Sequence, residues 1–382
     1  MLEIPLSGIK KIEEIAKSSD EYISLSQGSV KIGGIPQQIK DHIQTLLKTD
    51  KTDYYESCWG LKVLREKLAT VLSATYGASI TVNQILPTHG CIGGLSLLYL
   101  SILNPGDEVL IPEPTYPAYN ILTAASRSVP VFVPMKQHDN TGRTTFELDI
   151  PAIKAATTKK TKIIILANPG NPTGMVVPLA TIRQLLSWCE QHGIYLIIDE
   201  AYRDYAFTSE YQTALPLINQ SEWLIVASTF SKNMAMSGWR IGYLVMPERV
   251  NKALAGMQDA LLNCLNNTAQ YAALYALDHP EFTQQFHVMI KNNRDMTLRL
   301  LHPLIANNIV RVAEPQGSLF AFLKTDQEDA TDLCMSILHK AKVSMVPGSS
   351  FGPSGKPFLR LCYARDKAYL EEGINRIVKF FM

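Results

Sequence analysis

Short, continuously apolar segments alternate with stretches of helical periodicity through the middle of the chain, and this alternation restricts the possible folds. Runs such as IIIL, YLII and LIVA have no polar position that could face water, so they predict strands buried on both faces. Helices are expected between the strands, including Gly90–Leu103 and Leu179–His192. The pattern predicts an α/β fold with a parallel or mixed sheet. Its strands are expected at Ile85–Thr88, Glu108–Pro112, Lys162–Ala167, Ile194–Asp199, Trp223–Ser228 and Ile241–Val245.

The chain beyond Pro280 follows a different pattern. A long charged helical segment, Glu281–Leu301, precedes shorter strand-like pieces, which indicates a smaller α+β domain. We expect residues 1–40 to form an N-terminal arm and part of the small domain. Residues 41–280 should form the large domain, and residues 281–382 the C-terminal small domain. The shorter strands are expected at Ile309–Val312, Leu319–Leu323, Lys342–Val346 and Phe358–Cys362.

Composition excludes several classes of protein. The 382 residues carry a formal net charge of +1 with 19% charged residues, so neither a nucleic-acid-binding surface nor an acidic tail is indicated. The six cysteines are widely spaced without a CxxC pair, which argues against a disulfide framework or a zinc site. The N-terminus lacks the apolar core of a signal peptide, and no stretch is long and apolar enough for a membrane helix. We therefore expect a cytoplasmic protein with no metal and no membrane partner.

Three polar motifs follow three of the predicted strands. ANPGNPTG occupies residues 167–174, DEAY occupies residues 199–202, and TFSK occupies residues 229–232 with Arg240 eight residues beyond the lysine. In open α/β sheets, ligands bind outside the carboxyl ends of the strands. The three motifs are therefore expected to form one shared site.

The side chains in these motifs match the chemical needs of pyridoxal 5′-phosphate. Lys232 supplies an amine that can hold the cofactor aldehyde covalently and later move the substrate Cα proton. Asp199 supplies a carboxylate that keeps the pyridine nitrogen protonated, which makes the ring a better electron sink. Asn171 and Tyr202 supply hydrogen-bond donors for the phenolic oxygen.

A phosphate group also has candidate partners. Arg240 offers a permanent charge in a planar fork, and Thr229 and Ser231 offer hydroxyl groups. The turn at residues 87–92 offers backbone N–H groups at a helix N-terminus, where a phosphate is favoured.

The sequence resembles the fold-type I pyridoxal-phosphate-dependent enzymes, in particular the class I/II aminotransferases. The resemblance covers nearly the whole chain and implies a three-layer fold with a mostly parallel central sheet that binds the cofactor, beside a smaller α+β domain. It rests on NPGNPTG, DEAY, TFSK followed by SGWRIGY, PEPTYPAY, YESCWGLKVLR and PGSSFGPSGKPFLRLCYA, in the order of the family.

The resemblance assigns roles to individual residues. Tyr116 would stack on the pyridine ring, and Arg360 would hold the substrate α-carboxylate by two parallel bonds. Tyr55 would reach the phosphate bound by the neighbouring subunit, which implies a homodimer with shared sites. Catalytic roles fall to Lys232, Asp199 and Tyr202, cofactor binding to these three with Gly90, Cys91, Ile92, Tyr116, Asn171, Thr229, Ser231, Arg240 and Tyr55, and substrate binding to Arg360, Asn171 and Gly28.

The implied reaction is ping-pong transamination between an α-amino acid and a 2-oxo acid. No second arginine is available for a substrate side-chain carboxylate, so a neutral or aromatic donor is expected rather than an acidic one. The segment from Gly28 to Pro36 departs from the family pattern, which leaves the substrate open. A carbon–sulfur β-lyase or another reaction of the same cofactor is one alternative. A non-catalytic regulatory protein with the same fold is another, although no DNA-binding extension precedes the domain.

Overall fold

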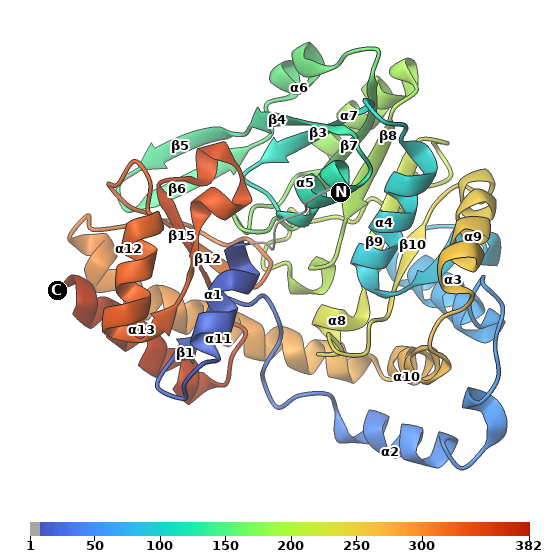
Figure 1. Ribbon diagram of the computed structural model, residues 1–382, viewed down its shortest axis with the longest axis horizontal. Helices are drawn as coiled ribbons and strands as arrows, with labels where there is room; N and C mark the ends of the chain where they lie inside the picture. The colour runs from blue at the N-terminus through green and yellow to red at the C-terminus, as the bar shows by residue number, and fades with distance from the viewer. Residues whose placement is uncertain (1–7) are drawn as a thin grey trace.

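The computed structural model describes residues 8–382. Its centre is a seven-stranded sheet in the order β2-β10-β9-β8-β7-β3-β4, in which β10 alone runs antiparallel to its neighbours (Figure 1). The strands are β2 (Ile85–Thr88), β3 (Glu108–Glu113), β4 (Val129–Pro134), β7 (Thr161–Ala167), β8 (Tyr195–Asp199), β9 (Leu224–Thr229) and β10 (Gly242–Val245). The mostly parallel sheet that we predicted is confirmed.

Sequence patterns place six of these strands to within one residue at each end. The seventh, β4, is not predicted, because its sequence VPVFVP contains two prolines that read as a break. Prolines are tolerated there because β4 lies at the edge of the sheet, where one side needs no backbone donors.

Helices cover both faces of the central sheet, as continuously apolar strands require. Alternate side chains of β7 point to opposite faces: Ile164 and Leu166 join one apolar core, whereas Ile163 and Ile165 join another. The first core includes side chains of α3 (Lys62–Tyr76), α6 (Ile150–Ala156), α7 (Leu179–His192) and α10 (Asn267–Leu277). The second includes side chains of α4 (Gly90–Ile102), α5 (Ala118–Ala125) and α9 (Glu248–Leu262). The three-layer arrangement is thereby confirmed.

A second sheet of six strands has the order β14-β15-β12-β11-β6-β5. It consists of β5 (Lys136–Asn140), β6 (Arg143–Glu147), β11 (Arg311–Ala313), β12 (Phe320–Lys324), β14 (Val346–Pro347) and β15 (Phe358–Cys362). The β5–β6 hairpin comes from the middle of the chain and joins the C-terminal strands through parallel pairing of β6 with β11. A pairing partner so distant in sequence leaves no local signal, so the sequence patterns did not predict it.

The single strand predicted at Lys342–Val346 is wrong in detail. The structure divides it into β13 (Val343–Ser344), which pairs with β1 (Ile23–Ser24), and β14, which pairs with β15. Both halves are fully buried, so their apolar pattern is continuous although their partners differ. The N-terminal segment is thus joined to the C-terminal part of the chain.

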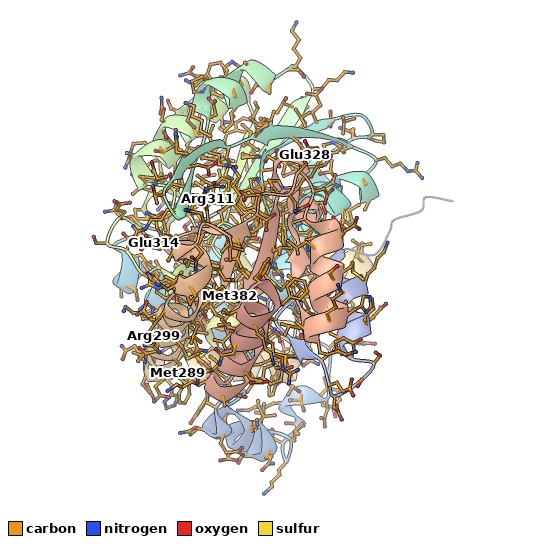
Figure 2. All side chains as sticks on the ribbon, turned by 90° about the vertical axis from the view of Figure 1, so that its left-hand side faces the viewer. Met289, Arg299, Arg311, Glu314, Glu328 and Met382 are labelled. Atoms are coloured by element: carbon orange, nitrogen blue, oxygen red, sulfur yellow. The ribbon has the colours of Figure 1, made fainter. Side chains whose placement is uncertain are left out.

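The remaining helices complete the molecule. They are α1 (Gly8–Ala16), α2 (Gln37–Leu46), α8 (Phe230–Asn233), α11 (Pro280–Ala306), α12 (Thr331–Ser336) and α13 (Lys367–Phe381). Figure 2 shows the second sheet and its helices from the side of the C-terminus, with Met289 and Arg299 on α11 and Met382 after α13. Within residues 8–382, no helix has the length and apolarity needed to cross a membrane.

Candidate active site

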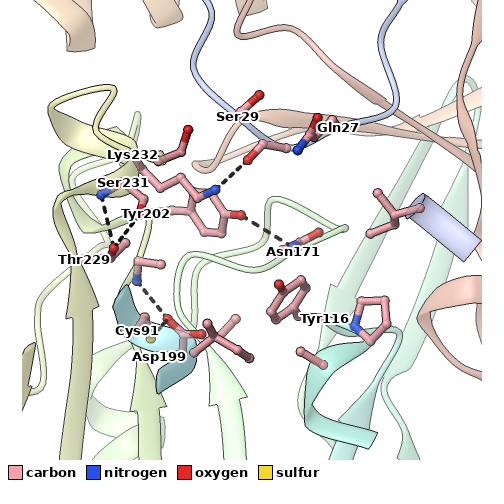
Figure 3. A pocket seen from close by; sticks show the side chains of 18 of the residues that line it. Gln27, Ser29, Cys91, Tyr116, Asn171, Asp199, Tyr202, Thr229, Ser231 and Lys232 are labelled. Atoms are coloured by element: carbon pink, nitrogen blue, oxygen red, sulfur yellow. Dashed lines mark hydrogen bonds between the residues drawn. The ribbon is translucent and has the colours of Figure 1, made fainter. Parts of the chain in front are cut away.

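The three polar motifs meet at the carboxyl ends of β7, β8 and β9. The parallel register places Ala167 beside Asp199 and Asp199 beside Ala227, so the segments that follow these strands leave the sheet side by side. They border a cavity of about 590 Å³. Predicted site residues that line it are Gly28, Cys91, Ile92, Tyr116, Asn171, Asp199, Tyr202, Thr229, Ser231, Lys232, Arg240 and Arg360. Figure 3 labels eight of them: Cys91, Tyr116, Asn171, Asp199, Tyr202, Thr229, Ser231 and Lys232.

One end of the cavity is formed by the first turn of α4 and by Arg240. Gly90 begins α4 with φ of 70°, and a Cβ atom there would lie 2.4 Å from Arg240 Nη2. The close approach of the guanidinium to the helix N-terminus therefore requires glycine. Ser231 Oγ accepts hydrogen bonds from Thr229 Oγ1 at 2.9 Å and from Arg240 Nη1 at 3.4 Å. A helix N-terminus, a guanidinium and two hydroxyls form a donor set suited to a phosphate.

Asp199 ends β8 and lies on the floor of the cavity. Its carboxylate accepts hydrogen bonds from Tyr119 Oη at 2.8 Å, from the backbone N–H of Ala201 at 3.0 Å and from the Cys91 thiol at 3.6 Å. Burial raises the pKa of Asp199 despite these donors, because removal from water disfavours the charged form. Such a carboxylate favours a cationic partner within the cavity, and a protonated pyridine nitrogen is one.

Tyr119 is a site residue that the sequence analysis missed. It is fully buried on α5, and its ring packs edge-on against that of Tyr116, with centroids 5.6 Å apart. The spacing of three residues within PTYPAY was the available signal, because two residues so spaced lie on one side of a helix. The pattern did not show that the Tyr119 hydroxyl would meet Asp199.

Lys232 extends from α8 into the cavity. Its Nζ donates a hydrogen bond to the carbonyl of Gly28 at 2.5 Å and lies 5.9 Å from the centre of the Tyr202 ring. The pKa of Lys232 is lowered to about 8, mainly by burial and in addition by the nearby Arg240 and Arg360 guanidiniums. The neutral amine, which is the nucleophile and the base, is therefore accessible near neutral pH.

Arg360 projects from β15 and is 1% exposed. Its Nη1 donates to Asn171 Oδ1 at 3.0 Å, and its Nη2 donates to the carbonyl of Ser26. The guanidinium lies over the rings of Phe320 and Phe351, at 4.1 and 4.7 Å from their centres. Burial lowers the pKa of Arg360 to about 10, so the group is still cationic at neutral pH.

Asn171 connects the arginine to Tyr202, because its Nδ2 donates to the Tyr202 hydroxyl at 3.5 Å. Burial raises the pKa of Tyr202 well above its usual value, so the phenol stays protonated and keeps its ability to donate. Arg360, Asn171 and Tyr202 thus form a continuous polar row. Figure 3 shows the contact of Asn171 with Tyr202.

The structure does not bring Tyr55 into this cavity. Tyr55 is 83% exposed and its neighbour Tyr54 is 74% exposed, both on the surface loop before Gly60. The predicted contact of Tyr55 with a neighbouring subunit stays a prediction.

Comparison with known proteins gives the family. The family model for aminotransferase class I and II matches residues 20–377. The chain is 32% identical over 380 residues to the probable aspartate/prephenate aminotransferase of Aquifex aeolicus, covering 97% of this chain and 93% of the relative. It is 31% identical over 333 residues to an aspartate aminotransferase of Sulfurisphaera tokodaii, covering 85% of this chain and 82% of the relative.

A solved structure supports the same grouping. The aspartate aminotransferase of Thermotoga maritima superimposes with a TM-score of 0.89 at 27% identity, over 99% of this chain and 97% of that one. Both comparisons agree with a cavity that combines an amine, a carboxylate, a phosphate-type donor set and a buried guanidinium. The chain belongs to the class I and II aminotransferases, a family of pyridoxal-phosphate-dependent enzymes.

Proposed function

We propose that this aminotransferase moves the amino group of a neutral or aromatic α-amino acid to a 2-oxo acid by a ping-pong mechanism with pyridoxal 5′-phosphate. The observation that carries the proposal is the convergence of Lys232, Asp199 and Arg360 on one cavity. These three groups are those that must hold the cofactor, tune its ring and bind an amino acid.

The residues of the cavity fit the cofactor at both of its ends. Backbone N–H groups at Gly90, Cys91 and Ile92, with the Arg240, Thr229 and Ser231 side chains, would hold the phosphate. Asp199 would face the ring nitrogen, and Tyr116 would cover the ring. When bound, pyridoxal phosphate supplies an aldehyde for the substrate amine and a ring that delocalises the electron pair left on Cα.

Lys232 is the group that moves the proton. As the neutral amine, its Nζ would take the proton from the substrate Cα and later give it back. Its lowered pKa keeps a useful fraction of the amine unprotonated at neutral pH. The aspartate carboxylate stays fixed during this transfer, because Tyr119 and the Ala201 N–H both donate to it.

Arg360 orients the substrate. Its terminal nitrogens each retain a hydrogen beyond those given to Asn171 and Ser26, and its buried Nε has no hydrogen-bond partner. A substrate α-carboxylate would accept two of these N–H groups in parallel charge-assisted bonds in a water-poor site. Its orientation would place the Cα–H bond within reach of Lys232.

The apolar part of the cavity wall supports a neutral or aromatic side chain. Apolar groups there come from α1, α4 and α5, and include Ile9, Leu95, Pro117, Ala118 and Ile121. A substrate side chain that replaces water against these groups gains about 25 cal/mol for each Å² of apolar surface buried.

A panel of amino donors tests the proposal. Leucine and phenylalanine should reversibly change the visible absorption of the holoenzyme, and a 2-oxo acid should restore it. Absence of this change with every donor would refute transamination. Release of pyruvate and ammonia from cystathionine without any acceptor would favour the β-lyase alternative.

One observation favours an acidic donor as a second candidate. Lys10 on α1 lines the same cavity and is a cation not used by the cofactor or by the α-carboxylate. The three compared proteins are named as aspartate or aspartate/prephenate aminotransferases. If Lys10 binds a side-chain carboxylate, Lys10→Met should raise KM for aspartate and leave KM for leucine unchanged. Equal effects on both donors would reject this second candidate.

A further inference from the structure

The segment Ser24–Ser29, here called the carbonyl loop, borders the cavity and is held in an unusual way. Its carbonyl oxygens all accept hydrogen bonds, and three basic side chains provide most of the donors. Lys232 donates to Gly28, and Arg360 donates to Ser26. The backbone N–H of Cys362 donates to Leu25 at 2.8 Å. The other three carbonyls, those of Ser24, Gln27 and Ser29, accept hydrogen bonds from Arg365.

Arg365 follows β15 and is 1% exposed. Its Nε donates to Ser24 O at 2.8 Å, its Nη1 to Ser29 O at 2.7 Å, and its Nη2 to Gln27 O at 2.6 Å. The planar guanidinium thus places one nitrogen on each of three carbonyls of a single loop. Only arginine can do this, since the lysine ammonium is a single point charge.

Because Arg365 is buried, loss of these hydrogen bonds would be costly. A buried cation is stable only if its donors are satisfied, and here they are satisfied by backbone oxygens of the carbonyl loop and of Ala364. Displacement of the loop would leave the Arg365 charge without partners, which is costly in a water-poor interior. The loop is therefore held in one conformation before any substrate binds.

A second buried group, the Glu13 carboxylate, also holds this loop. Glu13 of α1 is 3% exposed, and its Oε2 accepts hydrogen bonds from the hydroxyls of Ser24 and Ser26, both at 2.7 Å. The loop is therefore fastened through its carbonyls by Arg365 and through its hydroxyls by Glu13.

We propose that Arg365 is a positioning residue of the active site: it fixes the carbonyl loop so that Ser26 O holds the Arg360 guanidinium ready for the substrate α-carboxylate. The proposal rests on the proposed function, which assigns the α-carboxylate to Arg360. Arg365 touches neither substrate nor cofactor and acts through Ser26 O on Arg360. Through Gly28 O, the same loop also contacts Lys232 before the lysine bonds to the cofactor.

The test compares Arg365→Lys with the wild type and with Arg376→Met. Arg376 is the matched control, because its Nη1 also donates to a carbonyl of the N-terminal segment, Glu21 O at 3.1 Å, but Glu21 lies outside the carbonyl loop. We expect Arg365→Lys to raise KM for phenylalanine about tenfold and to change kcat less than about threefold, because ground-state binding is what is lost. Arg376→Met should leave KM unchanged.

Hydrogen exchange gives a readout that needs no activity. In Arg365→Lys, amides in a peptide spanning residues 20–32 should exchange faster than in the wild type, with cofactor bound in both. The decarboxylated amine phenethylamine should bind the variant and the wild type alike, since it has no carboxylate for Arg360. Affinity for the amine is measured by the absorption change of the holoenzyme.

Two results would overturn the proposal. One is faster exchange of the loop with a wild-type KM, and the other is a raised KM with equal loss for phenylalanine and phenethylamine. If Arg365→Lys does not fold, Glu13→Ala loosens the same loop and must raise KM for phenylalanine, or the proposal is wrong. A wild type that binds phenylalanine without transaminating would refute the proposed function and leave the exchange and binding tests of Arg365 intact.

Discussion

At the scale of single residues, burial controls the chemistry of the cavity more than charge pairing does. Removal from water is the largest influence on Asp199, Lys232 and Arg360, raising the first pKa and lowering the other two. Each of these side chains is then held in place by a small number of hydrogen bonds. Tyr119 is the clearest case, because it gives a hydroxyl to an otherwise desolvated carboxylate.

Tyr119→Phe should weaken both the fold and the cofactor site. Loss of one donor to a buried carboxylate costs about 1–3 kcal/mol of unfolding free energy. Cofactor affinity should fall as well, because Asp199 loses orientation. Denaturant unfolding and cofactor titration measure the two effects.

The control for this prediction is Tyr363→Phe. Tyr363 is fully buried and its hydroxyl donates to Ser318 O at 3.0 Å, away from the cavity. It should show a comparable loss of stability with unchanged cofactor affinity. Equal cofactor affinity in Tyr119→Phe and the wild type would contradict the role of Tyr119.

The lowered pKa of Lys232 predicts how cofactor uptake depends on pH. The neutral amine attacks the aldehyde, so the uptake rate of cofactor-free protein should rise with pH. Since the pKa of Lys232 is about 8, the midpoint should lie near pH 8 and the rate should level off above it. Stopped-flow absorbance with added pyridoxal phosphate measures the profile.

Nα-acetyllysine in solution, here called free lysine, is the comparison for the pH profile, because its side-chain amine, the one amine it has, keeps the ordinary pKa of 10.5. Its reaction with the aldehyde should keep accelerating through the range in which the protein has reached its plateau. A midpoint for the protein close to that of free lysine would show that burial does not activate Lys232.

At the scale of elements, the first turn of α4 determines where an anion can bind. Gly90 has positive φ and no side chain, so the backbone N–H groups of the turn approach Arg240 closely. The same helix packs its apolar side against β9 and β10, which fixes its N-terminus at the carboxyl end of β9.

Gly90→Ala should lower cofactor affinity by more than about tenfold, a loss of about 1.4 kcal/mol. The added methyl would lie 2.4 Å from Arg240 Nη2 and displace the guanidinium. Gly77→Ala is the matched control, because Gly77 also has positive φ, at 62°, yet a Cβ atom there would meet nothing within 4 Å. Both variants should lose stability by about 1 kcal/mol from backbone strain. Cofactor titration should separate them, and identical affinities would contradict the phosphate assignment.

At the scale of the whole molecule, several large apolar side chains are exposed to solvent. Leu47, Tyr54, Tyr55, Leu261 and Leu262 are between 42% and 83% exposed. Exposed large apolar groups often mark an interaction surface. A homodimer with shared sites, in which Tyr55 reaches the partner's phosphate, stays our prediction, as does the division into two domains.

Mixed dimers test the sharing of sites. Lys232→Ala alone should be inactive, and Tyr55→Ala alone should bind cofactor weakly. A hybrid of the two variants contains one site with an intact Lys232 and an intact Tyr55, so each hybrid dimer should have half the activity of a wild-type dimer. Sedimentation confirms that dimers have formed. No recovery of activity after subunit exchange would show that Tyr55 does not act across the interface.

Local sequence patterns determined much of this protein. The six core strands, the three polar motifs at their carboxyl ends and the family could all be predicted, because each depends on neighbouring residues or on short spacings. Lys232, Asp199 and Arg360 could be selected for the same reason, since each lies within a recognisable motif.

The tertiary structure alone decided which distant groups meet. Tyr119 lies 80 residues from Asp199, and Arg365 lies 336 residues from Ser29, yet each pair is hydrogen-bonded. The β5–β6 hairpin likewise gains its sheet from strands near the C-terminus. The spacing of apolar residues predicts which face of a helix or strand is buried. It does not predict which backbone carbonyl will lie opposite a buried polar group. Such contacts depend on how the whole chain packs. They hold the active-site side chains in place.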